Sequence, residues 1–324
     1  MQVAVIGTNH TLSDLNAREP WIQALRKISQ QLDLPYRMSY VPVVTCNRCE
    51  IYFSSDHLSH TVLFLQKLLE KMLGKSIENH SYTYVSRDCF FHLALVSSGL
   101  NSSQIGETDI RRQIKQSYEK ALPSISSSDL HFLFQKSLKI GKHFLGSLQG
   151  VQKQPSLEKI VVEMCKESLA RRSIFFLGNS QMNRKLIQRF LSLGGIEIHL
   201  CSQYNGASIP ENGVNLVDVS SIHEWKHCDI LICATHHDSY LITPSKDPIQ
   251  TRLIIDLSVP RSVDPQISVV NRLPVVNMDD LNRRLEIHQI TYLAQIEKAK
   301  QTAALFVDRS FGCFIHKTAC FNFQ

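Results

Sequence analysis

The sequence lacks the features that mark membrane and secreted proteins. No apolar run approaches the roughly 18 to 20 residues that a membrane-spanning helix needs, and the first residues have no basic leader ahead of an apolar core. The nine cysteines are odd in number and scattered, which argues against a disulfide framework and favours a reducing compartment. No internal repeat or low-complexity segment stands out. We therefore expect a cytoplasmic protein with no membrane partner.

Extremes of composition and charge are missing as well. Hydrophobic residues make up 43% and charged residues 20%, values typical of globular proteins with a sizeable core. The length of 324 residues allows two domains and an appendage, at about 150 residues per domain. The net charge of +6 is moderate. Basic clusters at 111–115 and 136–143 suit phosphates, but they suit any solvated helix face equally well.

Residues 1–150 alternate between strand-like and helix-like patterns. Apolar runs at 3–6, 38–44, 51–53 and 82–85 frame two stretches with helical apolar spacing. This order predicts a split βαβ, ferredoxin-like domain. Ser86 is the expected N-cap of the next helix, and helical patterns continue to residue 148.

Residues 151–277 carry apolar runs that are continuous rather than alternating, at 173–178, 196–201, 229–235 and 253–257. Such runs with helices between them predict a parallel sheet covered on both faces, in a Rossmann-like domain. From residue 278 the apolar spacing predicts one long helix, followed by a short C-terminal region that ends at 324. The fold class is therefore α/β.

The turn after the first continuous run is the candidate cofactor site. A strand–turn–helix places backbone N–H groups where a pyrophosphate can bind. Of the usual glycines only the first is present, in Gly178-Asn179-Ser180-Gln181-Met182-Asn183. No Asp or Glu occupies 201–203 at the end of the second strand, which slightly favours NADP over NAD. A doubly wound domain that binds no dinucleotide stays an open alternative.

The segment Thr45-Cys46-Asn47-Arg48-Cys49-Glu50 is the candidate reactive site of the first domain. It lies between two strand-like runs, so Cys46 would sit at the end of a strand with a guanidinium two residues on. A nearby positive charge favours the reactive thiolate. The same segment also fits a buried structural cysteine, a redox pair with Cys49, or half of a zinc site.

Other polar residues of the first domain have two interpretations each. His92 sits in an apolar helix, where it is either a hydrogen-bonded core residue or a catalytic one. Asp109 and Gln113 are one helical turn apart, just after Ser102 and Glu107. Together they could hold the ammonium and carboxylate of an amino acid, or they could be capping residues.

These motifs closely resemble the glutamyl-tRNA reductase family over the chain up to about residue 310. The resemblance rests on Gly7 to His10, Thr45 to Arg48, His92, Ser98 to Ser102, Ile105 to Glu107, Gln113, Ile255 to Arg261, and Met278 to Leu281.

The resemblance implies NADPH-dependent reduction of glutamyl-tRNA(Glu) to glutamate-1-semialdehyde, the entry step to 5-aminolevulinate, porphyrin and haem. It implies that Cys46 forms a thioester, that His92 supports catalysis, and that the turn at 178–183 binds NADPH, with no metal. A homodimer and glutamate-1-semialdehyde aminomutase are candidate partners. The implied contacts with the glutamyl group are Thr45, Asn47, Arg48, Ser102, Glu107, Thr108, Asp109 and Gln113.

Three departures from the family pattern carry expectations of their own. The cofactor turn is poor in glycine, so cofactor affinity or geometry is expected to differ. Thr108-Asp109 replaces a usual Pro-Gln and brings a negative charge towards the amino-acid pocket. The region after the long helix is short, so we expect weakened or alternative self-association. The competing functions are a catalytically weakened homologue that only binds tRNA or nucleotide, and a redox sensor that uses Cys46 and Cys49.

Overall fold

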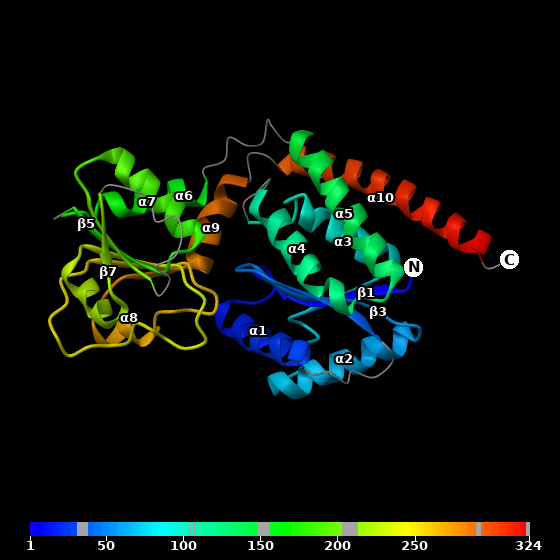
Figure 1. The fold of residues 1–324 in the computed structure, drawn as a ribbon, viewed down its shortest axis with the longest axis horizontal. Coiled ribbons are helices and arrows are strands. Elements are labelled where there is room, and N and C mark those ends of the chain that lie inside the picture. The colour runs from blue at the N-terminus through cyan, green and yellow to red at the C-terminus, as the bar shows by residue number, and fades with distance from the viewer. Residues whose placement is uncertain are drawn as a thin grey trace. The chain divides into compact units, whose positions relative to one another are not determined.

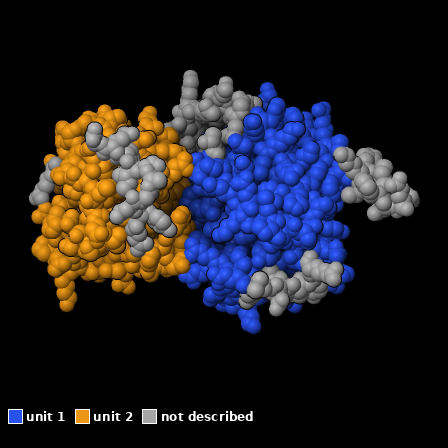
Figure 2. Space-filling model, viewed as in Figure 1, with its two compact units in different colours: residues 1–154, 286–324 blue, residues 155–285 orange. Residues whose placement is uncertain are grey.

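The protein forms two compact units, one of residues 1–154 and 286–324 and the other of residues 155–285 (Figures 1 and 2). The computed structural model describes residues 1–30, 38–103, 105, 108–147, 156–170, 172–202, 213–289 and 293–321. We call the unit of residues 1–154 and 286–324 unit 1, and the unit of residues 155–285 unit 2. None of the helices in these ranges combines the length and the apolarity that crossing a bilayer requires.

Unit 1 is built on a four-stranded antiparallel sheet with the order β2-β3-β1-β4. The strands are β1 (Val3–Asn9), β2 (Ser39–Val44), β3 (Arg48–Ser54) and β4 (Tyr82–Val85). Helices α1 (Leu15–Gln30) and α2 (Leu58–Leu73) follow β1 and β3. Because β3 separates the parallel strands β1 and β2, this is the predicted split βαβ arrangement.

Helices cover both faces of this sheet (Figure 1). Helices α1 and α2 pack on one face, and α3 (Ser86–Ser97), α4 (Thr108–Ala121) and α5 (Ser128–Ser147) pack on the other. A 3₁₀ turn, η1 (Leu122–Ser124), joins α4 to α5, and α10 (Leu293–Phe321) packs against α3 and α5. Strands β1 and β3 are consequently buried along their whole length.

The predicted N-cap of α3 is wrong. Val85 occupies that position and makes no side-chain capping bond. Ser86 has a positive φ of 49°, and its hydroxyl donates to the Met1 carbonyl oxygen at 2.7 Å. The serine therefore ties the start of the helix to the N-terminus of the chain.

Unit 2 is a parallel sheet with the order β10-β9-β8-β5-β6-β7, as predicted for a Rossmann-like domain. Its strands are β5 (Ser173–Leu177), β6 (Glu197–Cys201), β7 (Val214–Val217), β8 (Ile230–Cys233), β9 (Leu253–Asp256) and β10 (Val275–Asn277). The helices are α6 (Leu157–Lys166), α7 (Gln181–Leu193), η2 (Val219–His227), α8 (Gln266–Val270) and α9 (Met278–Gln289). The strand order reverses next to β5, where α/β sheets place their ligands.

Candidate active site

The turn between β5 and α7 requires its glycine. Gly178 has a φ of +93°, and a Cβ there would lie 2.6 Å from the Ala234 carbonyl oxygen and 2.8 Å from Thr235 Cβ. The Gly178 N–H also donates to the Cys201 carbonyl oxygen at 2.8 Å. The turn therefore lies against the residues that follow β8, and a side chain at position 178 would clash with them.

The residues that replace the missing glycines are built into this turn. Ser180 caps α7 by accepting the Asn183 N–H at 3.1 Å. Asn183 is fully buried, and its Nδ2 donates to the carbonyl oxygens of Leu177 at 3.0 Å and Gly178 at 2.7 Å. Both side chains thus hold the helix to the end of the strand. Gln181 and Met182 lie in the first turn of α7, exposed and half-buried respectively.

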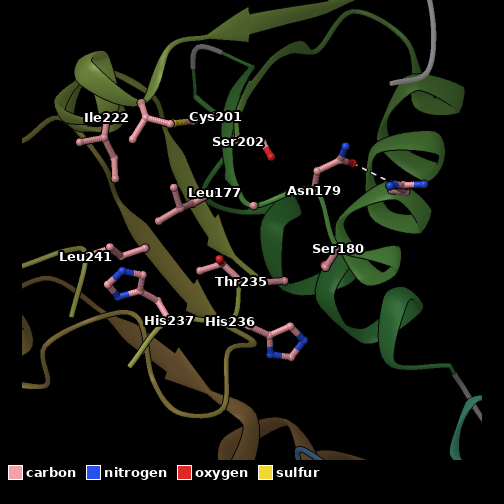
Figure 3. A pocket seen from close by; sticks show the side chains of 14 residues that line it. Leu177, Asn179, Ser180, Cys201, Ser202, Ile222, Thr235, His236, His237 and Leu241 are labelled. Atoms are coloured by element: carbon pink, nitrogen blue, oxygen red, sulfur yellow. Dashed lines mark hydrogen bonds between the residues drawn. The ribbon is translucent and has the colours of Figure 1, made fainter. Parts of the chain in front are cut away.

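A cavity of about 440 Å³ opens at the carboxyl ends of β5, β6 and β8 (Figure 3). One part of its lining is polar, with Asn179 and Ser180, and another is apolar, with Ile222 and Leu241. Its basic lining residues are Arg184, His236 and His237, and none of the described residues that line it is an Asp or Glu. The combination suits a ligand with a planar apolar ring and anionic groups.

A buried carboxylate shapes one wall of this cavity. Asp256 accepts the backbone N–H groups of Ser258 at 3.0 Å, Ser262 at 2.9 Å and Val263 at 3.0 Å. The Ser258 hydroxyl oxygen in turn accepts the N–H of Thr235, a lining residue, at 3.2 Å. Burial raises the pKa of Asp256 to about 6, although these hydrogen bonds act in the opposite direction.

In unit 1, Thr45, Cys46 and Asn47 form the connection between β2 and β3. The Thr45 N–H closes the hairpin by donating to the Arg48 carbonyl oxygen at 2.9 Å, and Thr45 Oγ1 accepts the Asn47 N–H at 3.2 Å. Asn47 Nδ2 donates to the Ser103 hydroxyl oxygen at 2.8 Å. Cys46 itself is only partly buried. The thiol therefore lies at an accessible turn whose neighbours are held in place.

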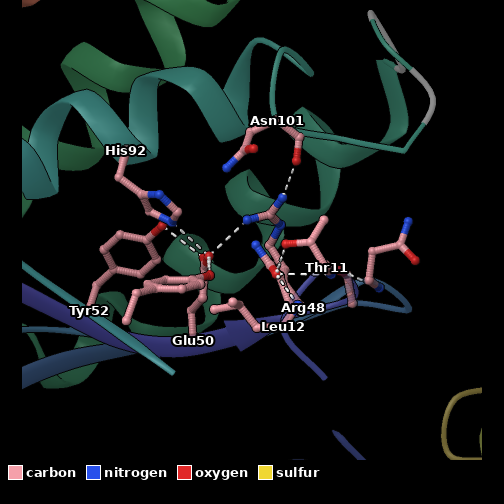
Figure 4. A network of polar contacts seen from close by, with 11 residues as sticks. Thr11, Leu12, Arg48, Glu50, Tyr52, His92 and Asn101 are labelled. Atoms are coloured by element: carbon pink, nitrogen blue, oxygen red, sulfur yellow. Dashed lines mark hydrogen bonds and ion pairs between the residues drawn. The ribbon is translucent and has the colours of Figure 1, made fainter. Parts of the chain in front are cut away.

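Next to this hairpin, Glu50 is the acceptor at the centre of a buried polar network (Figure 4). Its Oε1 accepts from Arg48 Nη1 at 2.8 Å, from His92 Nε2 at 2.8 Å, and from the Tyr82 hydroxyl. Its Oε2 accepts from the Tyr52 hydroxyl at 2.8 Å. One carboxylate thus orients four side chains from β3, β4 and α3.

The network stabilises the charges of Glu50 and Arg48. Burial alone would raise the pKa of Glu50, but the positive charges of Arg48 and His92 and the hydrogen bonds hold it well below its usual range. The Arg48 guanidinium is 1% exposed, and its Nη2 donates to the Asn101 carbonyl oxygen. Both terminal nitrogens of Arg48 therefore have partners inside the protein.

Gly7 provides the space that Glu50 occupies. It lies directly opposite Glu50 in the β1–β3 register. A Cβ on Gly7 would approach the Glu50 Cγ to 2.7 Å and the Cys49 carbonyl oxygen to 2.8 Å. The glycine of the Gly7 to His10 motif thus leaves room for the Glu50 side chain.

His92 is a buried, hydrogen-bonded residue of α3, 6% exposed. Because Glu50 is an anion, the 2.8 Å contact assigns the proton to His92 Nε2. Tyr82 and Tyr84 pack against the ring, with centroid separations of 5.0 and 4.9 Å. Within the described ranges, His92 Nδ1 makes no hydrogen bond, so this is the nitrogen available to a substrate.

Cys49 is far less accessible than Cys46, and access is one of the properties that govern thiol reactivity. It is completely buried, and burial raises its pKa to about 12. Its sulfur lies 3.9 Å from the Arg18 carbonyl oxygen. Among the described residues no cluster of three or more His, Cys, Asp or Glu side chains could hold a metal ion. The geometry argues against a Cys46–Cys49 redox pair and identifies Cys49 as a core residue.

The remaining predicted substrate residues lie between α3 and α4. Ser102 is buried, next to the Ser103 that binds Asn47. Asp109 is half-buried in the first turn of α4, 3.6 Å from Arg112, and Gln113 is half-buried one turn later. Glu107 and the side chain of Thr108 lie outside the described residues.

The sequence analysis assigned no role to Glu50 or Tyr82, although both belong to this site. The strand alternation Arg48-x-Glu50-x-Tyr52 places three polar side chains on one face, a signal that was available for Glu50. No local pattern connects this face to Tyr82, since β1 lies between β3 and β4 in the sheet.

Family models match both units. The model described as the N-terminal domain of glutamyl-tRNAGlu reductase matches residues 6–146, and the shikimate / quinate 5-dehydrogenase model matches residues 161–284. The first range contains the hairpin that carries Cys46, and the second contains the residues that line the cavity.

Similar proteins cover most of the chain. The glutamyl-tRNA reductase of Chlamydia abortus (strain DSM 27085 / S26/3) is 30% identical over 278 residues, which is 81% of this chain and 78% of that protein. The glutamyl-tRNA reductase of Desulfitobacterium hafniense (strain DSM 10664 / DCB-2) is 26% identical over 94% of this chain and 72% of its own length. The solved structure of glutamyl-tRNA reductase from Methanopyrus kandleri is 18% identical, with a TM-score of 0.49, and is covered over 80% of its chain.

Proposed function

Because this chain belongs to the glutamyl-tRNA reductase family, we propose that it reduces glutamyl-tRNA(Glu) to glutamate-1-semialdehyde and releases the tRNA, the first step towards 5-aminolevulinate and haem. The single observation that carries the proposal is the accessible Cys46 on its fixed hairpin, beside a buried network that orients His92. Unit 1 would carry the acyl chemistry and unit 2 the cofactor.

The first step is acyl transfer to sulfur. The Cys46 thiolate attacks the carbonyl carbon of the aminoacyl ester, the C–S bond forms, and the C–O bond to the tRNA ribose breaks. The released ribose oxygen takes a proton and leaves as a hydroxyl. A thioester accepts hydride more readily than an oxygen ester, so the chemistry requires a cysteine at this position rather than a serine.

His92 is proposed to act through Nδ1. Its Nε2 is bound to Glu50 at 2.8 Å, which fixes the ring and leaves Nδ1 to handle a proton or to polarise the carbonyl. Thr45, Asn47, Arg48 and Ser102 are proposed to frame the glutamyl group. Both terminal nitrogens of Arg48 have internal partners, so we assign it to shaping the pocket and orienting Glu50.

In the first turns of α4, we propose that Asp109 pairs with the substrate ammonium and that Gln113 hydrogen-bonds a substrate carboxylate. Support comes from their half-buried positions one turn apart on the same helix. Glu107 and Thr108 are proposed as further contacts on the basis of the family motif alone.

The family and its dehydrogenase-type second domain imply a nicotinamide cofactor. The cavity of unit 2 fits one, because Gly178 leaves a space that a Cβ would fill and Ser180 caps the helix that begins there. When bound, the nicotinamide would supply the hydride that converts the acyl group to an aldehyde. We propose NADPH rather than NADH, since the cavity is lined by Arg184, His236 and His237 and by no described carboxylate.

Partners and location complete the proposal. We propose cytoplasmic action, which the free thiols of all eight described cysteines support. A homodimer and docking of glutamate-1-semialdehyde aminomutase, which would receive the reactive aldehyde, are also proposed.

The test is NADPH oxidation with glutamyl-tRNA, compared with uncharged tRNA, in the wild-type protein and in Cys46→Ser. We expect turnover only with charged tRNA and a loss of at least about a thousandfold in Cys46→Ser. Cys313→Ser, which changes an exposed thiol of α10, is the matched control and should keep wild-type turnover. Mass spectrometry without NADPH should find glutamate on Cys46. A Cys46→Ser protein that turns over normally would end the proposal, and binding of tRNA without any reduction would favour the binding homologue.

A further inference from the structure

A buried arginine from α1 reaches the turn that carries Cys46. Arg18 is completely buried. Its Nη2 donates to the carbonyl oxygen of Cys46 at 3.4 Å, and its Nη1 donates to the carbonyl oxygen of Ser13. Cys46 and Ser13 belong to segments far apart in the sequence. One guanidinium therefore joins the start of α1 to the hairpin connection.

The backbone of the turn is held from two sides. On one side the His10 N–H donates to the Asn47 carbonyl oxygen at 2.9 Å. On the other, Arg18 meets the carbonyl group of Cys46 itself. The direction of the Cys46 side chain follows from the orientation of the peptide groups that flank it, so the Arg18 contact bears directly on where the thiol points.

The charge of Arg18 also acts on this hairpin. Burial raises the pKa of Cys49, and among the charges that lower it Arg18 ranks ahead of Arg48. The Arg48 charge lies 2.8 Å from the opposite charge of Glu50, so the two largely cancel at a distance. Arg18 therefore brings a positive charge to this hairpin that the sequence pattern does not reveal.

We propose that Arg18 is a positioning residue for the nucleophile: its buried guanidinium fixes the Cys46 carbonyl group and so holds the thiol of the turn in its reactive orientation. The inference rests on the proposed role of Cys46 as the nucleophile. It adds a residue of α1 to a site otherwise built from β3, β4, α3, α4 and their connections.

The test compares Arg18→Lys and Arg18→Gln with the wild-type protein. Arg26→Gln, a change of an exposed arginine on the same helix, is the matched control. The first measurement is the rate of iodoacetamide alkylation at Cys46 over a range of pH, read peptide by peptide, with the exposed Cys313 as internal reference. The second is kcat and KM for glutamyl-tRNA, and the third is thermal unfolding.

In Arg18→Lys, which keeps the charge but loses the planar fork, we expect alkylation of Cys46 and kcat to fall together by about tenfold, with KM unchanged. Both quantities should fall further in Arg18→Gln, and both should keep their wild-type values in Arg26→Gln. Alkylation and kcat at wild-type values in a folded Arg18→Lys protein would overturn the inference. So would unfolding of both Arg18 variants, or equally altered alkylation of Cys46 and Cys313, since either would assign Arg18 to the fold alone. If blocking Cys46 in the wild-type protein left reduction intact, the proposed function would fail instead, whatever Arg18 does.

Discussion

Replacing Glu50 by Gln tests whether the buried network of unit 1 depends on a negative charge. The substitution keeps the size of the side chain but turns one acceptor oxygen into a donor. That amide would face side chains that already donate to Glu50, namely Arg48, His92 and the two tyrosines. The Arg48 guanidinium would remain 1% exposed without its counter-charge.

The expected cost follows from the burial of the pair. Both side chains are at most 1% exposed and lie 2.8 Å apart, so solvent screens neither charge. Removing one partner of such a pair costs about 3 to 5 kcal/mol of folding free energy, because the other charge stays buried. For a unit of this size, that loss lowers the melting temperature by roughly 6 to 20 °C.

The two tryptophans allow the measurement to be confined to one unit. Trp21 is buried in α1 of unit 1, and Trp225 is buried in η2 of unit 2. In a Trp225→Phe background, the fluorescence of Trp21 reports urea unfolding of unit 1. Glu158→Gln changes a buried carboxylate of unit 2 and should leave that transition where it is.

A change of less than about 0.5 kcal/mol in the unfolding free energy of unit 1 would refute the reasoning, since substitutions of exposed residues already produce changes of that size. It would mean that Arg48 finds another counter-charge or that water enters the network. A large loss of stability should be accompanied by a loss of turnover, because His92 then loses the acceptor that fixes its Nε2 proton.

Three further predictions concern unit 2. Gly178→Ala should weaken NADPH binding at least about tenfold and destabilise unit 2 by about 1 to 3 kcal/mol. The control is Gly194→Ala: Gly194 also has a positive φ, but no atom lies within 4 Å of a Cβ placed there, so NADPH binding should be unchanged. NADPH titration measures the binding, and Trp225 fluorescence during unfolding measures the stability of unit 2. His236→Gln should weaken NADPH binding about fivefold, because it removes an imidazole ring that can donate a hydrogen bond to a phosphate from the cavity lining, and an unchanged affinity would contradict this. Asp256→Asn should abolish the gain in unit 2 stability that we expect on acidification from pH 7 to pH 4, and urea titrations at each pH would show whether it does.

The fold could be predicted because its signals are local. Continuous apolar runs identified β5, β6, β8 and β9, and the two helices between short strands identified the split βαβ arrangement. Strands β7 (Val214–Val217) and β10 (Val275–Asn277) were missed. They are edge strands, short and only partly buried, so their sequences lack the apolar run that marks a central strand.

The site was predictable only where its residues are adjacent in the sequence. Thr45 to Arg48 form one hairpin, and the sequence pattern places Cys46 at its turn. Arg18 and Glu50 were given no role, because their contacts with Cys46 and with His92 depend on tertiary packing. The partner of Arg48 was missed although its signal is local: a guanidinium two residues from a thiol need not face it, and in a strand it faces the residue two positions further on.

Glu50 and Asp256, each at most 1% exposed, have opposite environments, and this has a consequence for the response of the protein to acid. Glu50 meets the cation Arg48, whereas Asp256 is bound by backbone and side-chain hydrogen bonds alone, so burial lowers the stability of its charged form. The pKa of Glu50 is depressed in the folded state, so its contribution is present above its unfolded value of roughly 4.3 and is lost as the pH falls below it. The pKa of Asp256 is raised to about 6, so its contribution is fully present below roughly 3.9 and is lost as the pH rises through 6. Between pH 7 and pH 4 unit 2 should therefore gain about 2 to 3 kcal/mol from Asp256, whereas Glu50 should begin to destabilise unit 1 once the pH falls below roughly 4.3. Because Trp21 and Trp225 lie in different units, the opposite trends can be followed in one chain, and parallel trends would show that the two carboxylates do not govern the acid response.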